Sequence, residues 1–122
     1  MEEDKILIMM TSGPDTPRRC ATPFFMATLA AAMDYDVTMF FTIDGTLLLK
    51  KGMAATIFPK AGGKSVESYL NEALESGVKM TACTASTELH GLTAKDLIDG
   101  VKMVGGASFW QMSDGAKTVV SF

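Results

Sequence analysis

Five short segments of this chain have the hydrophobic pattern of β-strands. Two of them, 5–10 (KILIMM) and 36–42 (DVTMFFT), are nearly continuous apolar runs rich in branched and aromatic residues. Such runs are typical of strands buried on both faces of a parallel sheet. Segments 78–83 and 101–104 show the same character, the second more weakly, and 118–122 (TVVSF) predicts a final strand. We expect that last strand to be built into the sheet or into an interface.

Helical patterns fill the segments between these strands. Residues 17–33 predict a helix, but Pro23 lies inside it, so the helix either kinks there or restarts with Thr22 as its cap. Residues 65–76 have the spacing of an amphipathic helix that ends at Gly77. Shorter helices are predicted for 46–51, 93–97 (with a capping-box-like Thr93 and Asp96) and 107–112.

The alternation of strand and helix segments predicts an α/β fold. We predict a single, small, doubly wound domain over residues 1–122, with helices on both faces of its sheet. The sheet should hold about five mostly parallel strands.

The charge balance limits the partners that this chain is expected to bind. Eleven basic residues against 14 acidic ones give a formal net charge of −3. This charge argues against direct nucleic-acid binding and against a basic membrane-binding surface. The apolar segment 24–32 resembles a signal-peptide core, but it starts too late and is far shorter than the ~20 residues that span a bilayer. With two cysteines and no secretory signal, we expect a cytoplasmic protein.

Motifs for phosphate binding, metal binding and hydrolysis are incomplete. Residues 63–65 (GKS) resemble the end of a Walker A loop, but Phe58 stands where that motif needs its first glycine. The soft ligands Cys20, Cys83 and His90 are too few and too widely spaced for a structural zinc site. No G-x-S-x-G nucleophile elbow is present either. We therefore predict neither a metal nor a cofactor.

Cys83 is the strongest candidate for a catalytic residue. It ends the strand-like run 78–83 and precedes a predicted short helix, which is where open α/β sheets place their sites. Amides at a helix start favour thiolate over thiol, and thiolate is the form that attacks sulfur. The alternative is a buried structural cysteine.

Three other residues are candidates for supporting roles. Ser86 completes a Cys-x-x-Ser arrangement, and it either hydrogen-bonds a sulfur anion or caps the following helix. His90 either faces the thiol as an acid–base group or is an ordinary surface residue. Cys20 follows the first strand and is either a resolving or relay thiol for Cys83 or a small core residue.

Four segments carry a resemblance to a known family. They are 5–19 (KILIMMTSGPDTPRR), 30–37 (AAAMDYDV), 39–53 (MFFTIDGTLLLKKGM) and 78–101 (VKMTACTASTELHGLTAKDLIDGV). Through them the chain resembles the DsrE/DsrF-like family of small sulfur-relay proteins. The last segment is the most specific, because a strand ending in Cys and followed by His-Gly is similar to the family's active-cysteine segment. The resemblance implies a five-stranded α/β sheet and a sulfur-carrying role for Cys83.

The resemblance also implies a function. Cys83 would hold sulfane sulfur as a persulfide or thiosulfonate and relay it to a partner thiol, in tRNA thiolation or in sulfur oxidation. The expected partners are sulfur donor and acceptor proteins or small sulfane-sulfur compounds, and we expect a homo-oligomer, either a dimer, a trimer or a hexamer. Whether the protein turns over as a sulfurtransferase or only carries sulfur stays open.

Two other functions remain open from the sequence. A thiol peroxidase or redox sensor would form a sulfenate on Cys83, resolved by Cys20 or by a partner thiol. A non-catalytic oligomeric or regulatory module would keep both thiols buried. The apolar residues Phe109, Trp110 and Met112 belong either to an interface or to the core.

Overall fold

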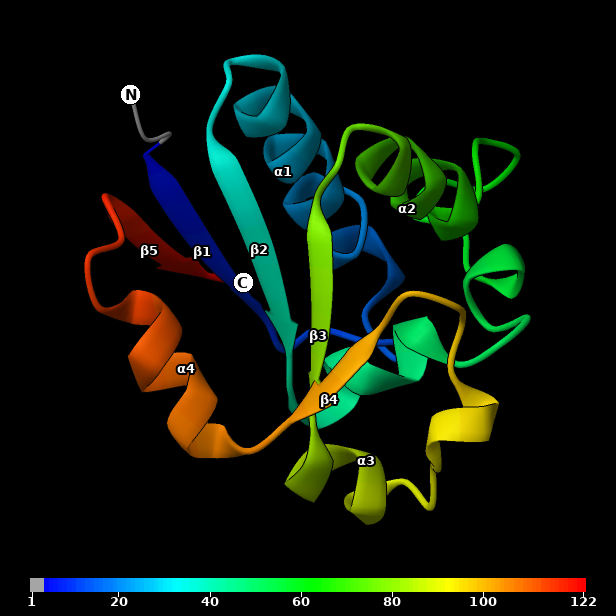
Figure 1. Cartoon of the computed structure of the whole chain (residues 1–122). Coiled ribbons are helices and arrows are strands. Elements are labelled where there is room, and N and C mark those ends of the chain that lie inside the picture. Colours follow the sequence, from blue (N-terminus) through cyan, green and yellow to red (C-terminus); the bar gives the residue numbers. More distant parts are fainter. Residues whose placement is uncertain (1–3) are drawn as a thin grey trace.

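Five parallel strands form one sheet in this computed structural model, which describes residues 4–122 (Figure 1). The strands are β1 (Lys5–Met10), β2 (Asp36–Phe41), β3 (Lys79–Cys83), β4 (Lys102–Val104) and β5 (Thr118–Ser121). Their order across the sheet is β4-β3-β2-β1-β5, and every pairing is parallel. The predicted α/β fold is therefore confirmed, and β5 is built into the sheet by its pairing with β1.

Helices and 3-10 turns connect the strands. The helices are α1 (Thr22–Ala32), α2 (Val66–Glu75), α3 (Thr84–Leu89) and α4 (Gly106–Ser113). The 3-10 elements are η1 (Pro17–Arg19), η2 (Ile43–Leu49), η3 (Ala54–Thr56) and η4 (Ala94–Asp96). The predicted helix 46–51 is thus a 3-10 element that begins at Ile43. The predicted capping box is present at η4, where the Thr93 amide donates to Asp96 Oδ2 at 2.7 Å.

The predicted helix 17–33 is divided into two elements. After η1 the chain bends, and α1 begins at Thr22, so the helix restarts rather than kinks. Ala21 is the N-cap residue, which corrects the expected cap at Thr22. Pro23 lies in the first turn of α1, where a backbone N–H has no intrahelical acceptor, so the proline costs no helical hydrogen bond.

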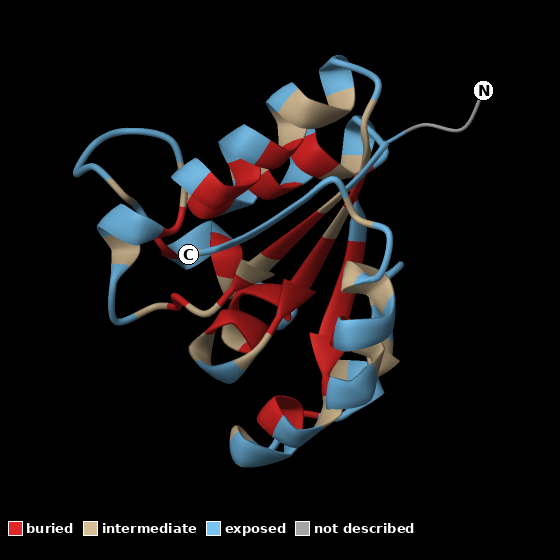
Figure 2. Cartoon of the chain, turned by 90° about the vertical axis from the view of Figure 1, so that its left-hand side faces the viewer, coloured by how far each residue is buried: buried red, intermediate tan, exposed pale blue. Residues whose placement is uncertain are grey.

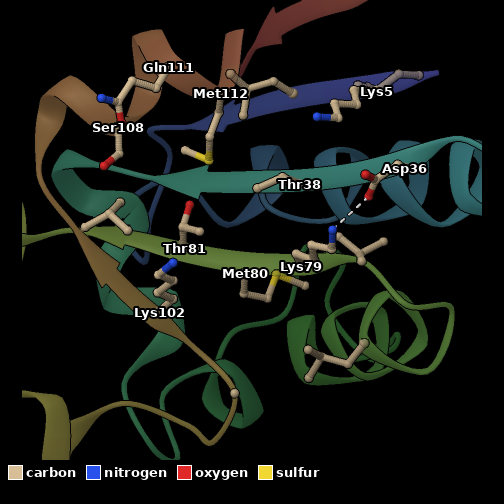
Figure 3. A pocket seen from close by; sticks show the side chains of 16 residues that line it. Lys5, Asp36, Thr38, Lys79, Met80, Thr81, Lys102, Ser108, Gln111 and Met112 are labelled. Carbon is tan, nitrogen blue, oxygen red and sulfur yellow. Dashed lines mark ion pairs between the residues drawn. The ribbon is translucent and has the colours of Figure 1, made fainter. Parts of the chain in front are cut away.

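The two faces of the sheet are covered unequally. Helices α1 and α2 pack on one face and enclose the larger hydrophobic core, and Figure 2 shows the buried strands beneath this helical layer. The second face is covered by α4 alone. Its smaller cluster consists of Leu7, Phe40, Cys83 and Phe109. The amino-terminal half of the second face is open and lines a cavity of about 650 Å³ (Figure 3).

Two glycines let the loops after β1 and β2 pack backbone against backbone at the carboxyl edge of the sheet. A Cβ atom at Gly13 would overlap the carbonyl oxygen of Asp44, and one at Gly45 would overlap that of Met10. Because only glycine lacks a Cβ, these close approaches need glycine at both positions. The packing fixes η2 at the edge where β3 ends.

Among the described residues, no helix has the length and apolar character needed to cross a bilayer.

Candidate functional site

Cys83 joins the end of β3 to the start of α3. It is the last residue of the strand and the N-cap residue of the helix, with extended backbone angles (φ −70°, ψ 122°). Its side chain lies on the second face of the sheet, in the cluster beneath α4, and the residue is 7% exposed. The predicted position at the carboxyl edge of a parallel sheet is therefore the observed one.

Hydrogen-bond donors converge on the Cys83 sulfur. Burial by itself raises the pKa of this thiol, but the amide and hydroxyl of Ser86, the amide of Ala85 and the hydroxyl of Thr42 all lower it. The donors outweigh the burial, so the pKa of Cys83 lies below its ordinary value. Donors stabilise the charged form of an acid, and the site therefore favours a thiolate.

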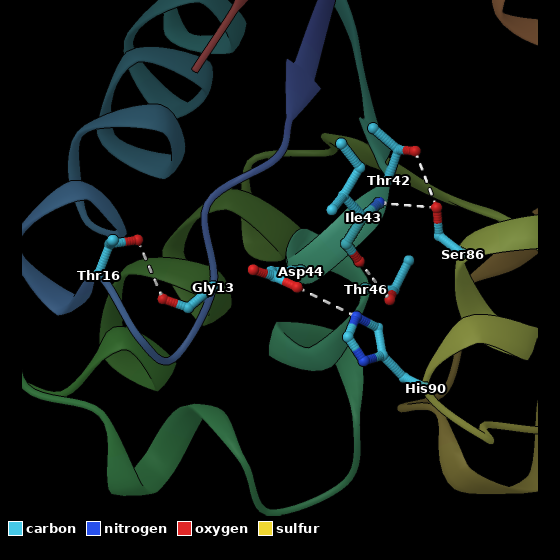
Figure 4. Close-up of polar contacts among 8 residues, drawn as sticks. All are labelled: Gly13, Thr16, Thr42, Ile43, Asp44, Thr46, Ser86 and His90. Carbon is cyan, nitrogen blue, oxygen red and sulfur yellow. Dashed lines mark hydrogen bonds and ion pairs between the residues drawn. The ribbon is translucent and has the colours of Figure 1, made fainter.

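Ser86 is the centre of this donor network (Figure 4). Its Oγ accepts a hydrogen bond from the Ile43 amide at 2.7 Å and lies 2.9 Å from Thr42 Oγ1. Because the Ile43 amide occupies one lone pair, the Ser86 hydroxyl is oriented and its proton is directed to Cys83 or Thr42. Ser86 lies in the first turn of α3 and does not cap it; the sulfur-bonding alternative agrees with this geometry.

Ile43 holds an uncommon backbone conformation beside this network. Its φ is +53°, a left-handed value that is a true outlier for a β-branched residue, and its side chain is 51% exposed. Such conformations cost about 1–3 kcal/mol and persist only where the surroundings enforce them. Here the backbone contact between Gly13 and Asp44 fixes the segment, and the Ile43 amide points at Ser86 as a result.

Thr42 and Ile43 are residues of the site that sequence reasoning missed. A signal for Thr42 existed in the strand pairing. Phe41 of β2 pairs with Ala82 of β3, so the next residue on each side, Thr42 and Cys83, should lie next to each other. Parallel strands bring such equivalent positions to one edge. The left-handed backbone of Ile43 had no signal, because its residue type opposes that conformation.

His90 lies at the far end of α3 and contacts Asp44. His90 Nε2 is 3.2 Å from Asp44 Oδ1, but the two groups are not aligned as a hydrogen bond, and Nε2 is buried without another partner. The structure thus brings His90 to η2, and His90 is not among the groups that shift the pKa of Cys83.

Cys20 belongs to the larger core on the other face of the sheet. It is fully buried, and its Sγ donates to the carbonyl oxygens of Gly13 (3.2 Å) and Thr16 (3.3 Å). Burial raises the pKa of Cys20 to about 11. Both cysteines are free thiols, and Cys20 has the surroundings of the small core residue that the sequence left as one alternative.

Within residues 4–122, no group of three or more His, Cys, Asp or Glu side chains is arranged to hold a metal ion.

The fold and the site together define a class: a small parallel α/β protein with a thiolate-favouring cysteine at the carboxyl edge of its sheet. The sequence model of the DsrE/DsrF-like family matches residues 4–122, so the chain belongs to this family. The resemblance seen in the sequence is thereby confirmed.

Two curated relatives illustrate the range of the family. The sulfur carrier protein DsrE2 of Allochromatium vinosum is 27% identical over 152 residues, which cover 93% of this chain and 94% of that protein. Uncharacterized protein MJ0760 of Methanocaldococcus jannaschii is 30% identical over 110 residues, covering 87% of this chain. The match covers only 38% of MJ0760, so that relative is much longer.

Solved structures share the fold. The ychN protein from E. coli superposes with a TM-score of 0.82 at 20% identity, covering 98% of this chain and 99% of that chain. Protein BT1422 from Bacteroides thetaiotaomicron has a TM-score of 0.70 at 15% identity, covering 98% and 95%. At these identities the likeness concerns the fold alone.

Proposed function

We propose that this protein is a sulfur carrier that holds sulfane sulfur on Cys83 and relays it to a partner thiol. The observation that carries the proposal is the convergence of donors from Ser86, Ala85 and Thr42 on one sulfur atom. Membership of the DsrE/DsrF-like family and the similarity to a protein named as a sulfur carrier support a sulfur-relay role in general.

Loading begins with attack of the Cys83 thiolate on a sulfane sulfur. With tetrathionate, a bond forms between Cys83 Sγ and one inner sulfur, the central S–S bond breaks, and thiosulfate leaves with the electron pair. With a polysulfide, attack on the terminal sulfur gives a Cys83 persulfide and a polysulfide that is one sulfur shorter. Either adduct carries negative charge on its outer atoms, which the donors around Cys83 would stabilise.

Unloading reverses this chemistry with a different thiol. An acceptor thiolate attacks the outer sulfur of the Cys83 persulfide, the bond to Cys83 Sγ breaks, and Cys83 returns as a thiolate. A lowered pKa makes Cys83 a better leaving group in this step, because leaving thiols depart faster when their pKa is low. The same donors therefore serve loading and unloading.

We further propose that the protein forms a homo-oligomer through α1. The outward side of α1 and its C-terminal end bears apolar side chains that are 43–68% exposed. They are Phe25, Met26, Leu29 and Met33. Large exposed apolar patches mark interaction sites, and methionines suit adaptable ones.

Of the interface candidates near the end of the chain, Phe109 lies in the core, whereas Trp110 is 72% exposed.

The test is the intact mass of reduced protein after brief exposure to tetrathionate or polysulfide. We expect a gain of thiosulfonate or sulfur that maps to the peptide holding Cys83 and is reversed by dithiothreitol. Cys83→Ser should abolish the adduct, whereas the matched variant Cys20→Ser should keep it. An adduct that persists in folded Cys83→Ser protein would contradict the proposal.

A thiol peroxidase or redox sensor is the second candidate, favoured by the lowered pKa of Cys83, since thiolates also react with peroxide. Cys20 is fully buried in the core cluster on the opposite face, so the resolving thiol would have to come from a partner. Peroxide consumption no faster than that of a free thiol would exclude this function.

A further inference from the structure

The open cavity on the second face of the sheet has no part in the sulfur chemistry proposed for Cys83. Its volume of about 650 Å³ lies within the range of small-molecule sites, about 300–1,000 Å³. Its floor is the amino-terminal half of the sheet, and residues of α4 form a wall above it (Figure 3). The cavity is therefore large enough for a drug-sized molecule.

The charge of the lining is opposite to that of the whole protein. Among the residues that the structure describes, Lys5, Lys79 and Lys102 come from three different strands and line the cavity together with a single carboxylate, Asp36. Three lysines and one aspartate give the lining a formal charge of +2, whereas the chain carries −3. A concave surface of one sign concentrates small ions of the other sign. The cavity is thus suited to an anion.

Internal pairing leaves much of this positive charge available. Asp36 is paired with Lys79 at 3.2 Å. Among the residues that the structure describes, Lys102 has no ion-pair partner and Lys5 has none either, and both side chains are exposed. An anion in the cavity would therefore meet ammonium groups that no carboxylate of the described chain neutralises.

The polar floor is unusual for a parallel sheet, whose faces are normally apolar and covered by helices. The strand register places Thr38 beside Lys79 and Thr81 beside Lys102, so each of these exposed lysines lies next to a threonine, and Thr81 itself is buried. The Thr81 hydroxyl is held by donation to the Met39 carbonyl at 2.9 Å, which fixes the floor. Core packing does not account for the exposed lysines at these positions.

The inner end of the cavity is apolar. Leu7, Val104 and Met112 line it there and also pack in or against the hydrophobic cluster beneath α4. Ligand sites characteristically combine such apolar walls with a few placed polar groups. We propose that this cavity binds a small organic anion: an acid with a sulfonate, carboxylate or phosphate group at the lysines and an apolar body against the inner wall.

The test uses 8-anilinonaphthalene-1-sulfonate, a fluorescent sulfonate with an apolar body, titrated into the full chain at low salt. We expect saturable one-site binding that weakens as salt is added. The double variant Lys5→Gln/Lys102→Gln should weaken binding by about tenfold, because it removes the two charges next to the anion that no carboxylate of the described residues pairs with. Ser108→Trp, which places a large side chain in the cavity from α4, should abolish binding.

Matched controls separate the cavity from other sites. Lys60→Gln/Lys95→Gln makes the same charge change at exposed lysines outside the cavity and should leave the affinity unchanged. Cys83→Ser should also bind normally, so failure of the sulfur-carrier function would leave this proposal intact. The proposal would be overturned if the Lys60→Gln/Lys95→Gln control lost affinity for the probe. It would also be overturned if only Leu29→Glu, which disrupts the apolar surface of α1, lost that affinity. Binding that disappears as protein concentration rises would overturn it too, because a second copy would then fill the cavity.

Discussion

The two cysteines of this protein lie in contrasting surroundings, although both are buried. Cys83 is 7% exposed, and amide and hydroxyl donors of Ser86, Ala85 and Thr42 lower its pKa. Cys20 is fully buried and donates to two carbonyl oxygens, and burial raises its pKa to about 11. The two thiols are on opposite faces of one sheet, in separate hydrophobic clusters.

The comparison shows that burial raises the pKa of a thiol, as at Cys20, and that surrounding hydrogen-bond donors reverse this effect at Cys83. A carbonyl oxygen can only accept, so it stabilises the protonated thiol of Cys20. An amide or hydroxyl donates to sulfur, so it stabilises the thiolate of Cys83. The difference arises because Cys83 occupies a helix start, where backbone amides are free, whereas Cys20 follows η1 and lies against the carbonyls of Gly13 and Thr16, which also accept backbone hydrogen bonds.

The largest expected consequence is in chemical reactivity. A shift from 9.0 to about 11 leaves Cys20 with about 100-fold less thiolate at neutral pH than an ordinary thiol. Cys83 should therefore react with iodoacetamide at least about 100-fold faster than Cys20 in native protein. Peptide mass spectrometry over a time course at pH 7 measures both rates in one sample.

The denatured protein supplies the control, because unfolding removes both environments and should make the two rates nearly equal. Slow labelling of both cysteines in native protein would contradict the comparison. It would favour the non-catalytic module, in which both thiols are inert.

The second expected effect follows when one of the donors that lower the pKa of Cys83 is removed and the surroundings of Cys20 are left unchanged. Ser86→Ala removes a hydroxyl donor to Cys83 and leaves the Ile43 amide without its acceptor. The pKa of Cys83 should rise and its alkylation rate at pH 7 should fall about five- to tenfold, since a hydrogen bond to a charged group is lost. The free energy of unfolding should also fall by about 1–3 kcal/mol, because a buried donor is unsatisfied.

Ser65→Ala is a suitable control for this variant. Ser65 is the N-cap residue of α2 and makes no side-chain capping bond, so its loss should alter neither quantity much. An unchanged pH profile of Cys83 alkylation in Ser86→Ala would mean that the backbone amides alone set its reactivity.

The sequence predicted the fold because hydrophobic runs determine which segments are buried, and the observed strand bounds differ from the predicted ones by about one residue. It also placed Cys83 and Ser86 together, since they are three positions apart within one turn. Thr42 and Ile43 follow the neighbouring strand β2 and lie more than 40 residues from Ser86 in the sequence. Their contribution depends on strand register and on a left-handed backbone, neither of which a local pattern encodes. The partners of Cys20 and His90 are set by loop packing, which is equally non-local.

The smallest expected effect concerns stability at alkaline pH, where the two thiols should act with opposite signs. Because the folded pKa of Cys20 is about 11 and its ordinary value is 9.0, the unfolded chain loses this proton first as pH rises. The stabilisation from protonated Cys20 is therefore complete below about pH 9 and is lost as the pH rises toward 11. By pH 9.5 the loss amounts to about 0.8 kcal/mol. Cys83 has a lowered folded pKa, so its contribution grows as pH rises toward the ordinary value.

Urea unfolding at pH 7.5 and 9.5, under reducing conditions, measures both contributions by difference. The stability of wild type relative to Cys20→Ser should fall between the two pH values, since serine donates to the same carbonyls but does not ionise in this range. The stability of wild type relative to Cys83→Ser should rise over the same interval. Groups that titrate in all three proteins cancel in these differences, so their signs report the two thiols alone. Two differences of the same sign would mean that burial, and not the polarity of the hydrogen-bond partners, governs both cysteines.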